Sequence, residues 1–72
     1  MSLKNTALSR LVEYRRARMK HTAALAATKA AEGTEGHGAA IEALDAAEAA
    51  RNTAHNELLQ VAELYDRALN PP

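Results

Sequence analysis

Apolar residues recur every three to four positions along two long stretches of the chain, and a glycine-rich segment separates the two stretches. This spacing predicts amphipathic helices. The separating segment, Gly33–Gly38, contains all three glycines of the protein, and the two prolines are Pro71 and Pro72. Glycine is common just past a helix end because it accepts a positive φ angle without a steric clash. The sequence therefore predicts a helix over about 3–32, a loop over 33–38 and a helix over about 39–69.

The residues at the outer ends of these segments are also typical of helix boundaries. Ser2 can cap the first helix, since a serine hydroxyl accepts a hydrogen bond from a free backbone N–H of the first turn. Asn70, Pro71 and Pro72 end the second helix, because proline disfavours helical conformation in the residue before it. A six-residue loop makes the two helices antiparallel neighbours. We therefore expect residues 1–72 to form one all-α domain, an antiparallel helical hairpin of the alanine-rich coiled-coil type.

The second predicted helix has one broad apolar face, whereas the first has two narrow ones. We expect the first stripe of helix 3–32 to pack against helix 39–69 and the second stripe to stay uncovered. A second copy or another protein would then cover it, and pairing into a four-helix bundle is the simplest solution. The first stripe is Leu8, Val12, Met19, Ala23, Ala26 and Ala30, the second is Leu3, Ala7, Leu11, Tyr14 and Leu25, and the broad face is Ala40, Ala43, Leu44, Ala47, Ala50, Ala54, Leu58, Val61, Ala62, Tyr65, Ala68 and Leu69.

Composition narrows the function classes. Alanine accounts for 18 of the 72 residues, which favours helix, and the absence of cysteine excludes disulfides and cysteine-based zinc or redox motifs. No apolar run approaches the roughly 18 residues of a membrane span. His21, His37 and His55 lack the spacing of a metal-binding helix, and His37 falls in the predicted loop. We therefore expect a cytoplasmic, non-enzymatic protein without cofactor, metal, membrane or small-molecule substrate.

Charge is distributed unevenly although the net charge is zero. Residues 1–32 hold seven basic and two acidic residues, a net charge of +5, and residues 33–72 hold two basic and seven acidic residues, a net charge of −5. Such a distribution can select the antiparallel pairing of the two helices, as flanking charges do in coiled coils. Alternatively, the basic segment from Arg10 to Lys20 binds an acidic partner.

A polar band crosses the middle of the predicted hairpin. If the chain folds back about residues 35–36, Arg16 lies opposite His55 and Lys20 lies opposite Arg51. A buried charge needs a partner. The band is either a register-fixing network, in which Glu48 neutralises Arg51, or a patch open to a partner. Its members are Arg15, Arg16, Arg18, Lys20, His21, Glu48, Arg51 and His55.

These features favour a small protein-interaction module, that is, an adaptor, chaperone or inhibitor subunit, which binds a protein partner through the first helix and forms a homodimer. Tyrosine and arginine often dominate interface energies. The expected partner-binding residues are therefore Leu11, Tyr14, Arg15 and Arg18. The alternative is a dimeric regulator that binds RNA or DNA through Arg10, Arg15, Arg16, Arg18 and Lys20.

Overall fold

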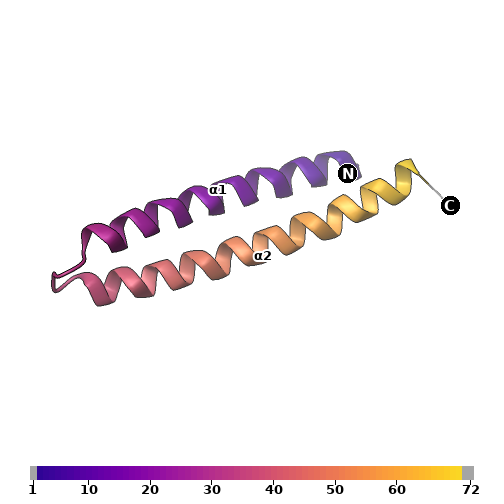
Figure 1. Ribbon diagram of the computed structural model, residues 1–72. Coiled ribbons are helices and arrows are strands. Elements are labelled where there is room, and N and C mark those ends of the chain that lie inside the picture. The colour runs from indigo at the N-terminus through magenta and orange to yellow at the C-terminus, as the bar shows by residue number, and fades with distance from the viewer. Residues whose placement is uncertain (1, 71–72) are drawn as a thin grey trace.

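The computed structural model describes residues 2–70, which form two long helices and no strand. Helix α1 spans Leu3–Ala30 and helix α2 spans His37–Leu69. The helices lie side by side in antiparallel orientation, with the loop at one end of the rod and both termini at the other (Figure 1). The rod measures 56 × 18 × 14 Å. The predicted helical hairpin is thus confirmed for a single chain.

The start of α1 is the one that the sequence predicted. The Ser2 side chain accepts a hydrogen bond from the backbone N–H of Asn5, with 3.1 Å between Oγ and N. At the other end of the hairpin, α2 finishes at Leu69, and the N–H of Asn70 closes its last turn on the carbonyl of Asp66. The two prolines expected to end α2 lie outside the described residues.

The loop begins and ends two residues earlier than predicted. Helix α1 stops at Ala30 rather than near residue 32, and α2 starts at His37 rather than near Ala39. The carbonyl of Ala31 accepts hydrogen bonds from both the N–H and the hydroxyl of Thr34, which closes a turn that contains Gly33. Gly33 takes the positive φ angle, 77°, that the turn requires. His37, expected in the loop, is the first residue of α2.

The contact between α1 and α2 follows a heptad repeat. Half-buried residues recur at alternating spacings of three and four, which is the pattern of a coiled-coil seam. We call these residues the seam. On α1 they are Ala7, Arg10, Tyr14, Ala17, His21, Ala24 and Thr28, and on α2 they are His37, Ala40, Leu44, Ala47, Arg51, Ala54, Leu58, Val61 and Tyr65.

The predicted assignment of the two stripes on α1 is wrong. Leu8, Val12 and Met19, expected against α2, are exposed, whereas Ala7 and Tyr14 of the stripe expected to be free lie in the seam. Backbones approach most closely where the facing side chains are small, and the α1 side of the seam contains three alanines and no leucine. The face predicted for α2 does contain its seam from Ala40 to Tyr65.

None of the described residues is fully buried, and large apolar side chains remain exposed along both helices. Two helices cover one face of each other and leave the remaining faces to solvent. Neither α1 nor α2 is long and apolar enough to cross a membrane. The hairpin therefore has a seam but no enclosed core within residues 2–70.

Thr28 joins the two backbones near the loop. Its hydroxyl lies 2.8 Å from the carbonyl oxygen of Ala24 on its own helix and 3.1 Å from that of Ala40 on α2. One hydroxyl proton is shared between the two acceptors. An approach of a side-chain oxygen to the opposing main chain requires closely spaced helix axes, which Ala24 and Ala40 permit.

We predict that Thr28→Val lowers the free energy of unfolding by about 0.5–1.5 kcal/mol, because valine keeps the shape of threonine but donates no hydrogen bond. Urea denaturation followed by circular dichroism at one protein concentration measures the change. Thr53→Val, at an exposed position of α2, is the matched control and should change stability little. Equal losses in both variants would contradict the role given to Thr28.

Candidate functional site

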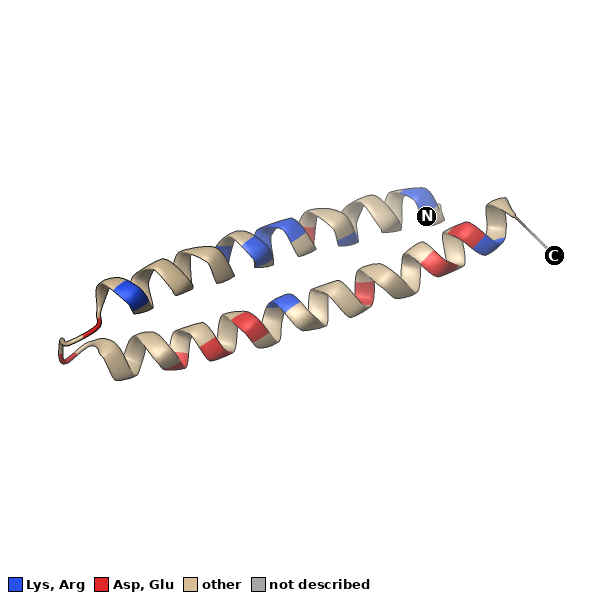
Figure 2. Ribbon diagram, in the orientation of Figure 1, with Lys and Arg blue, Asp and Glu red and all other residues tan. Residues whose placement is uncertain are grey.

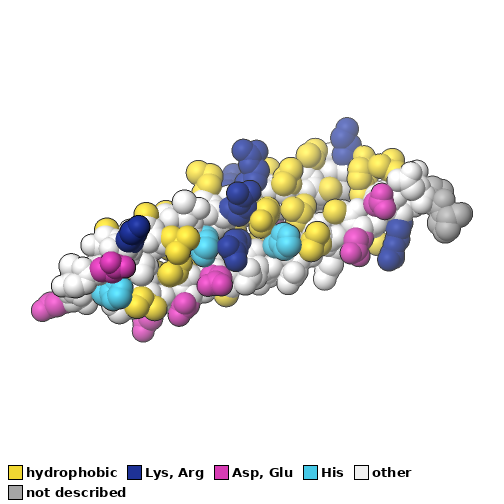
Figure 3. All heavy atoms as spheres, in the orientation of Figure 1, with side chains coloured by type: hydrophobic (Ala, Val, Ile, Leu, Met, Phe, Trp, Pro, Cys, Tyr) yellow, Lys and Arg dark blue, Asp and Glu magenta, His cyan; other side chains and the backbone are white. Residues whose placement is uncertain are grey.

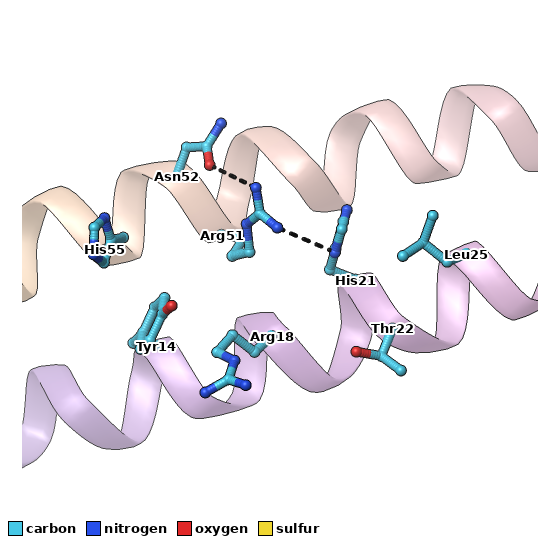
Figure 4. Close-up of a pocket in the computed structure, with 8 residues that line it drawn as sticks. All are labelled: Tyr14, Arg18, His21, Thr22, Leu25, Arg51, Asn52 and His55. Carbon is cyan, nitrogen blue, oxygen red and sulfur yellow. Dashed lines mark hydrogen bonds between the residues drawn. The ribbon is translucent and has the colours of Figure 1, made fainter.

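A shallow groove lies across the middle of the hairpin, at the level of the predicted polar band. Its volume is about 460 Å³. We call it the central groove. Both helices contribute to it, and Figure 4 shows that the side chains of its two halves face one another across the seam. The lining residues are Tyr14, Arg18, His21, Thr22 and Leu25 of α1 and Arg51, Asn52 and His55 of α2.

Arg51 occupies a seam position and reaches across to α1. Its Nη1 lies 3.5 Å from Nδ1 of His21, and its Nη2 donates to Oδ1 of Asn52 at 3.1 Å. Arginine has no acceptor, so the contact with His21 requires the tautomer in which Nδ1 carries no proton. The predicted pairing of Arg51 with Glu48 is wrong, because Glu48 is exposed and makes no ion pair with Arg51. The guanidinium contacts His21 and Asn52 rather than a carboxylate.

A second group of contacts adjoins this one. The rings of Tyr14 and His55 lie with their centroids 5.3 Å apart and their planes tilted by 41°. The guanidinium of Arg18 stands over the Tyr14 ring, with its Cζ 5.8 Å from the ring centroid, in a cation–π arrangement. Tyr14 is thus held between both helices and is half-buried. It supports Arg18 rather than standing free as a contact residue.

The register of the hairpin lies close to the rough fold-back estimate. His55 contacts Tyr14, two residues from Arg16, and Arg51 contacts His21, one residue from Lys20. Arg16 and Lys20 lie on the other side of the seam, where they border a small hollow with Ala47 and Ala50. A fold-back estimate from the loop cannot resolve such shifts, because one residue rotates a side chain by about 100° around its helix.

Arg10 is the basic residue that ties the two helices together. Its Nη1 lies 3.0 Å from Oε2 of Glu13 on α1 and 3.2 Å from Oε2 of Glu57 on α2. The hydrogen bond and charge of Glu13, together with the charge of Glu57, raise the pKa of the Arg10 guanidinium above its ordinary value. Arg10 therefore remains charged and is engaged within the hairpin, which sets it apart from its basic neighbours.

The other basic residues of α1 remain exposed. All ion pairs among residues 2–70 involve Arg10, so Arg15, Arg16, Arg18 and Lys20 have no carboxylate partner within the hairpin. Figure 2 shows basic residues spread along α1 and acidic residues along α2. Apart from the Arg10–Glu57 ion pair, basic residues of α1 and acidic residues of α2 do not pair across the two helices among residues 2–70.

A further apolar surface lies on the outside of α1, away from α2. Met19 is 72% exposed, Leu8 52% and Val12 45%. We call these three residues, with the exposed Arg15 and Arg16 beside them, the outer face of α1. Two shallow hollows follow it along the helix, one beside Leu8 and Val12 and one beside Met19. These three residues belong to one predicted stripe, but that stripe was expected to pack against α2 and is instead exposed.

The expected site residues therefore fall into distinct places. Leu11, Arg15 and Arg18 are exposed on α1, while Tyr14 lies in the seam. Arg51 and His55 both line the central groove, and Glu48 does not. Within residues 2–70, no three potential metal-ligating side chains converge.

Comparison of the sequence with known protein families, and of the chain with curated proteins and solved structures, finds no match. The function of the hairpin is therefore inferred from the positions, exposure and charges of its own residues.

We predict that Arg51→Leu raises the free energy of unfolding by about 1 kcal/mol, because an apolar side chain at a seam position is covered without having to be desolvated as a charge. Thermal unfolding followed by circular dichroism measures the change. Arg16→Leu removes the same charge at an exposed position and should leave the stability nearly unchanged. A loss of stability in Arg51→Leu would show that the contacts with His21 and Asn52 outweigh the cost of burying the guanidinium.

Proposed function

We propose that this hairpin is a small non-enzymatic protein-interaction module, an adaptor, chaperone or inhibitor subunit, that binds a protein partner through α1. The observation that carries the proposal is the outer face of α1. Leu8, Val12 and Met19 are exposed on α1 at spacings of four and seven residues, on the side away from α2. Apolar residues at such spacings are the anchors of helices that bind in the groove of a partner.

The chemistry of the outer face also specifies the partner. Arg15 and Arg16 lie beside Val12 and Met19 and are exposed. Complementary charges steer association and suppress wrong partners, while desolvated apolar anchors supply most of the affinity. The proposed partner therefore offers an apolar groove with acidic residues at its rim. Of the residues expected from sequence, Arg15 belongs to this face, and Leu11 and Arg18 lie at its margin.

We predict that the double variant Val12→Ser/Met19→Gln loses at least about tenfold in affinity for a partner captured by the parent hairpin, because it removes two apolar anchors. Capture from a lysate of the source cells identifies the partner, and titration by calorimetry measures the affinity. The matched control is Leu64→Gln, since Leu64 is 51% exposed but lies on α2. The proposal fails if Leu64→Gln weakens binding as much as the double variant does.

A second candidate, a regulator that binds RNA or DNA, is favoured by one observation. Arg15, Arg16, Arg18 and Lys20 are exposed on α1 without acidic partners in the hairpin. Arg10 also belongs to the expected set, but Glu13 and Glu57 already engage it. A single helix with four free cations can follow a phosphate backbone.

The two candidates differ in their response to salt. If the four cations of α1 contact phosphates, raising the salt concentration from 50 to 200 mM should lower the affinity for a nucleic-acid duplex by about 100-fold. Fluorescence anisotropy with labelled RNA and DNA duplexes measures this dependence. Binding that changes little with salt, or no binding at 50 mM salt, would exclude the second candidate.

Pairing of two hairpins into a four-helix bundle is part of the proposal. It is supported by the absence of any fully buried side chain among residues 2–70 and by the exposed leucines and isoleucine that lie off the seam. A chain of this size needs a further covered surface for stability. Self-pairing supplies that surface and leaves Val12, Met19 and Arg16 of the outer face of α1 for another protein.

A further inference from the structure

The hairpin exposes more surface than a chain of its mass normally does. Its accessible surface is 5523 Å². A compact monomer of 7.7 kDa exposes about 4300 Å², so the excess is about 1200 Å². A stable protein–protein interface covers about 800 Å² on each partner. The excess is therefore large enough for one complete interface.

More than half of the exposed large apolar side chains lie on one side of the rod. Arg18 and His55, which line the central groove, each follow a seam alanine by one residue. A helix repeats nearly every seven residues. On either helix, a residue that directly follows a seam position, or a position that continues the seam by this repeat, therefore lies on the same side of the rod as Arg18 and His55. We call it the groove side. Figure 3 shows hydrophobic side chains there on both flanks of a polar middle. The exposed apolar residues at these positions are Leu8, at the border with the outer face, Leu11, Leu25, Ile41, Leu59 and Leu69.

The charges on the groove side separate by helix. On α1 they are mostly basic, with Arg18 at the groove and Arg15 and Lys29 nearby. On α2 they are mainly acidic, with Asp45 and Glu48 toward the loop and Asp66 toward the chain ends, and Arg51 at the groove is the basic exception. On the opposite side of the seam, Arg10 of α1 pairs with Glu57 of α2 within one chain. The groove side lacks such a pair.

Two hairpins can pack groove side to groove side in two symmetric ways. With a twofold axis across the rod, the loops lie at opposite ends, and α1 packs on α1 of the second copy. With a twofold axis along the rod, the loops lie at the same end, and α1 packs on α2 of the second copy. The first arrangement brings two basic helices together and two acidic helices together, whereas the second brings each basic helix against an acidic one.

We infer that the hairpin forms a homodimer in which two copies pack through the groove side with their loops at the same end, α1 of each copy lying on α2 of the other. This inference rests on the self-pairing proposed above and specifies its geometry. Like charges placed opposite one another cost several kcal/mol across an interface, and opposite charges select the register. Charge therefore decides between two arrangements that cover the same apolar side chains.

The residues that meet in this arrangement can be read from the contacts within one chain. A twofold axis along the rod preserves height, and within one hairpin Arg10 lies level with Glu57 and His21 with Arg51. Arg18 of one copy therefore comes within about one helical turn of Glu48 of the second copy, and Lys4 within about one turn of Asp66. The apolar residues on the groove side also match: Leu11 of one copy lies at nearly the same position along the rod as Leu59 of the second copy.

A distance measurement tests this geometry. The chain contains no cysteine, so Glu35→Cys places one spin label on the exposed loop. Loops at the same end should give a label separation of about 20 Å, set by helix spacings of 8–10 Å. Loops at opposite ends should give a separation near the 56 Å length of the rod. In a dimer of one Glu35→Cys chain and one Asn5→Cys chain, the same-end arrangement places the two labels at opposite ends of the rod, so their separation should be long.

Sedimentation equilibrium on the same samples separates the two levels of the proposal. A dimer with close loop labels is the expected result. A dimer with loop labels a rod length apart would overturn the same-end geometry and leave self-pairing intact. A monomer at all concentrations would overturn both, without bearing on partner binding through Val12 and Met19.

A pair of neighbouring arginines supplies an independent test of the charge argument. Arg15→Glu reverses a charge on the groove side and should raise the dimer dissociation constant about tenfold or more, because it makes α1 less complementary to the mainly acidic groove side of α2 in the second copy. Arg16→Glu makes the same change at the next residue, which points away from the groove side, and should have a much smaller effect. Equal effects of the two variants on dimerisation would contradict the proposed interface. Helical circular dichroism of both variants checks that the hairpin is retained.

Discussion

The close approach of two helix axes along an alanine-rich seam is the constraint from which the other features of the hairpin follow. The α1 side of the seam includes Ala7, Ala17 and Ala24, and Thr28 contacts the α2 main chain near the loop. Small side chains bring the helices together, but they cover little apolar area per residue. The large side chains must therefore point elsewhere, and Met19 and Leu8 do so. The exposed surface of the molecule is a direct consequence of its small-residue seam.

The polar residues in the middle of the seam lower the stability of the hairpin but define the register of its two helices. Arg51 and His21 stand where an ordinary coiled coil has leucine, and they contact each other across the helices. A single polar seam residue can fix register and partner choice at a cost in stability. Here the neighbouring Tyr14–His55 contact adds a second fixed point two turns along α1. Sliding by one heptad would separate both pairs at once, so the antiparallel register is well defined despite the scarcity of large apolar contacts.

Local signals in the sequence were sufficient for the fold. Ser2 and the glycine segment mark helix ends through backbone chemistry that acts over a few residues, and both appear in the structure within two residues of the predicted positions. The seam of α2 was also predictable, since Leu44, Leu58 and Val61 repeat on one face. On α1 the large apolar residues lie off the seam, so a prediction that places the largest side chains inside chose the wrong face.

The candidate site could be predicted in composition but not in geometry. The sequence indicated a polar band that contains Arg18, Arg51 and His55, and these three residues do line one groove. The pairing within the band depends on rotation of each helix about its axis, which a shift of one residue changes completely. The alternation of three and four residues through Ala17, His21 and Ala24 was the signal that could have supplied this rotation.

The position of Thr28 near the loop also bears on the order in which the hairpin assembles. Thr28 and Ala40 are 12 residues apart in the chain, whereas Arg10 and Glu57 are 47 apart. The entropy lost in closing a chain segment grows with its length, so the pair near the loop can form at lower cost. Each later contact then closes only a few further residues, and the remaining seam can zip toward the termini. An architecture of this kind has low contact order and folds fast.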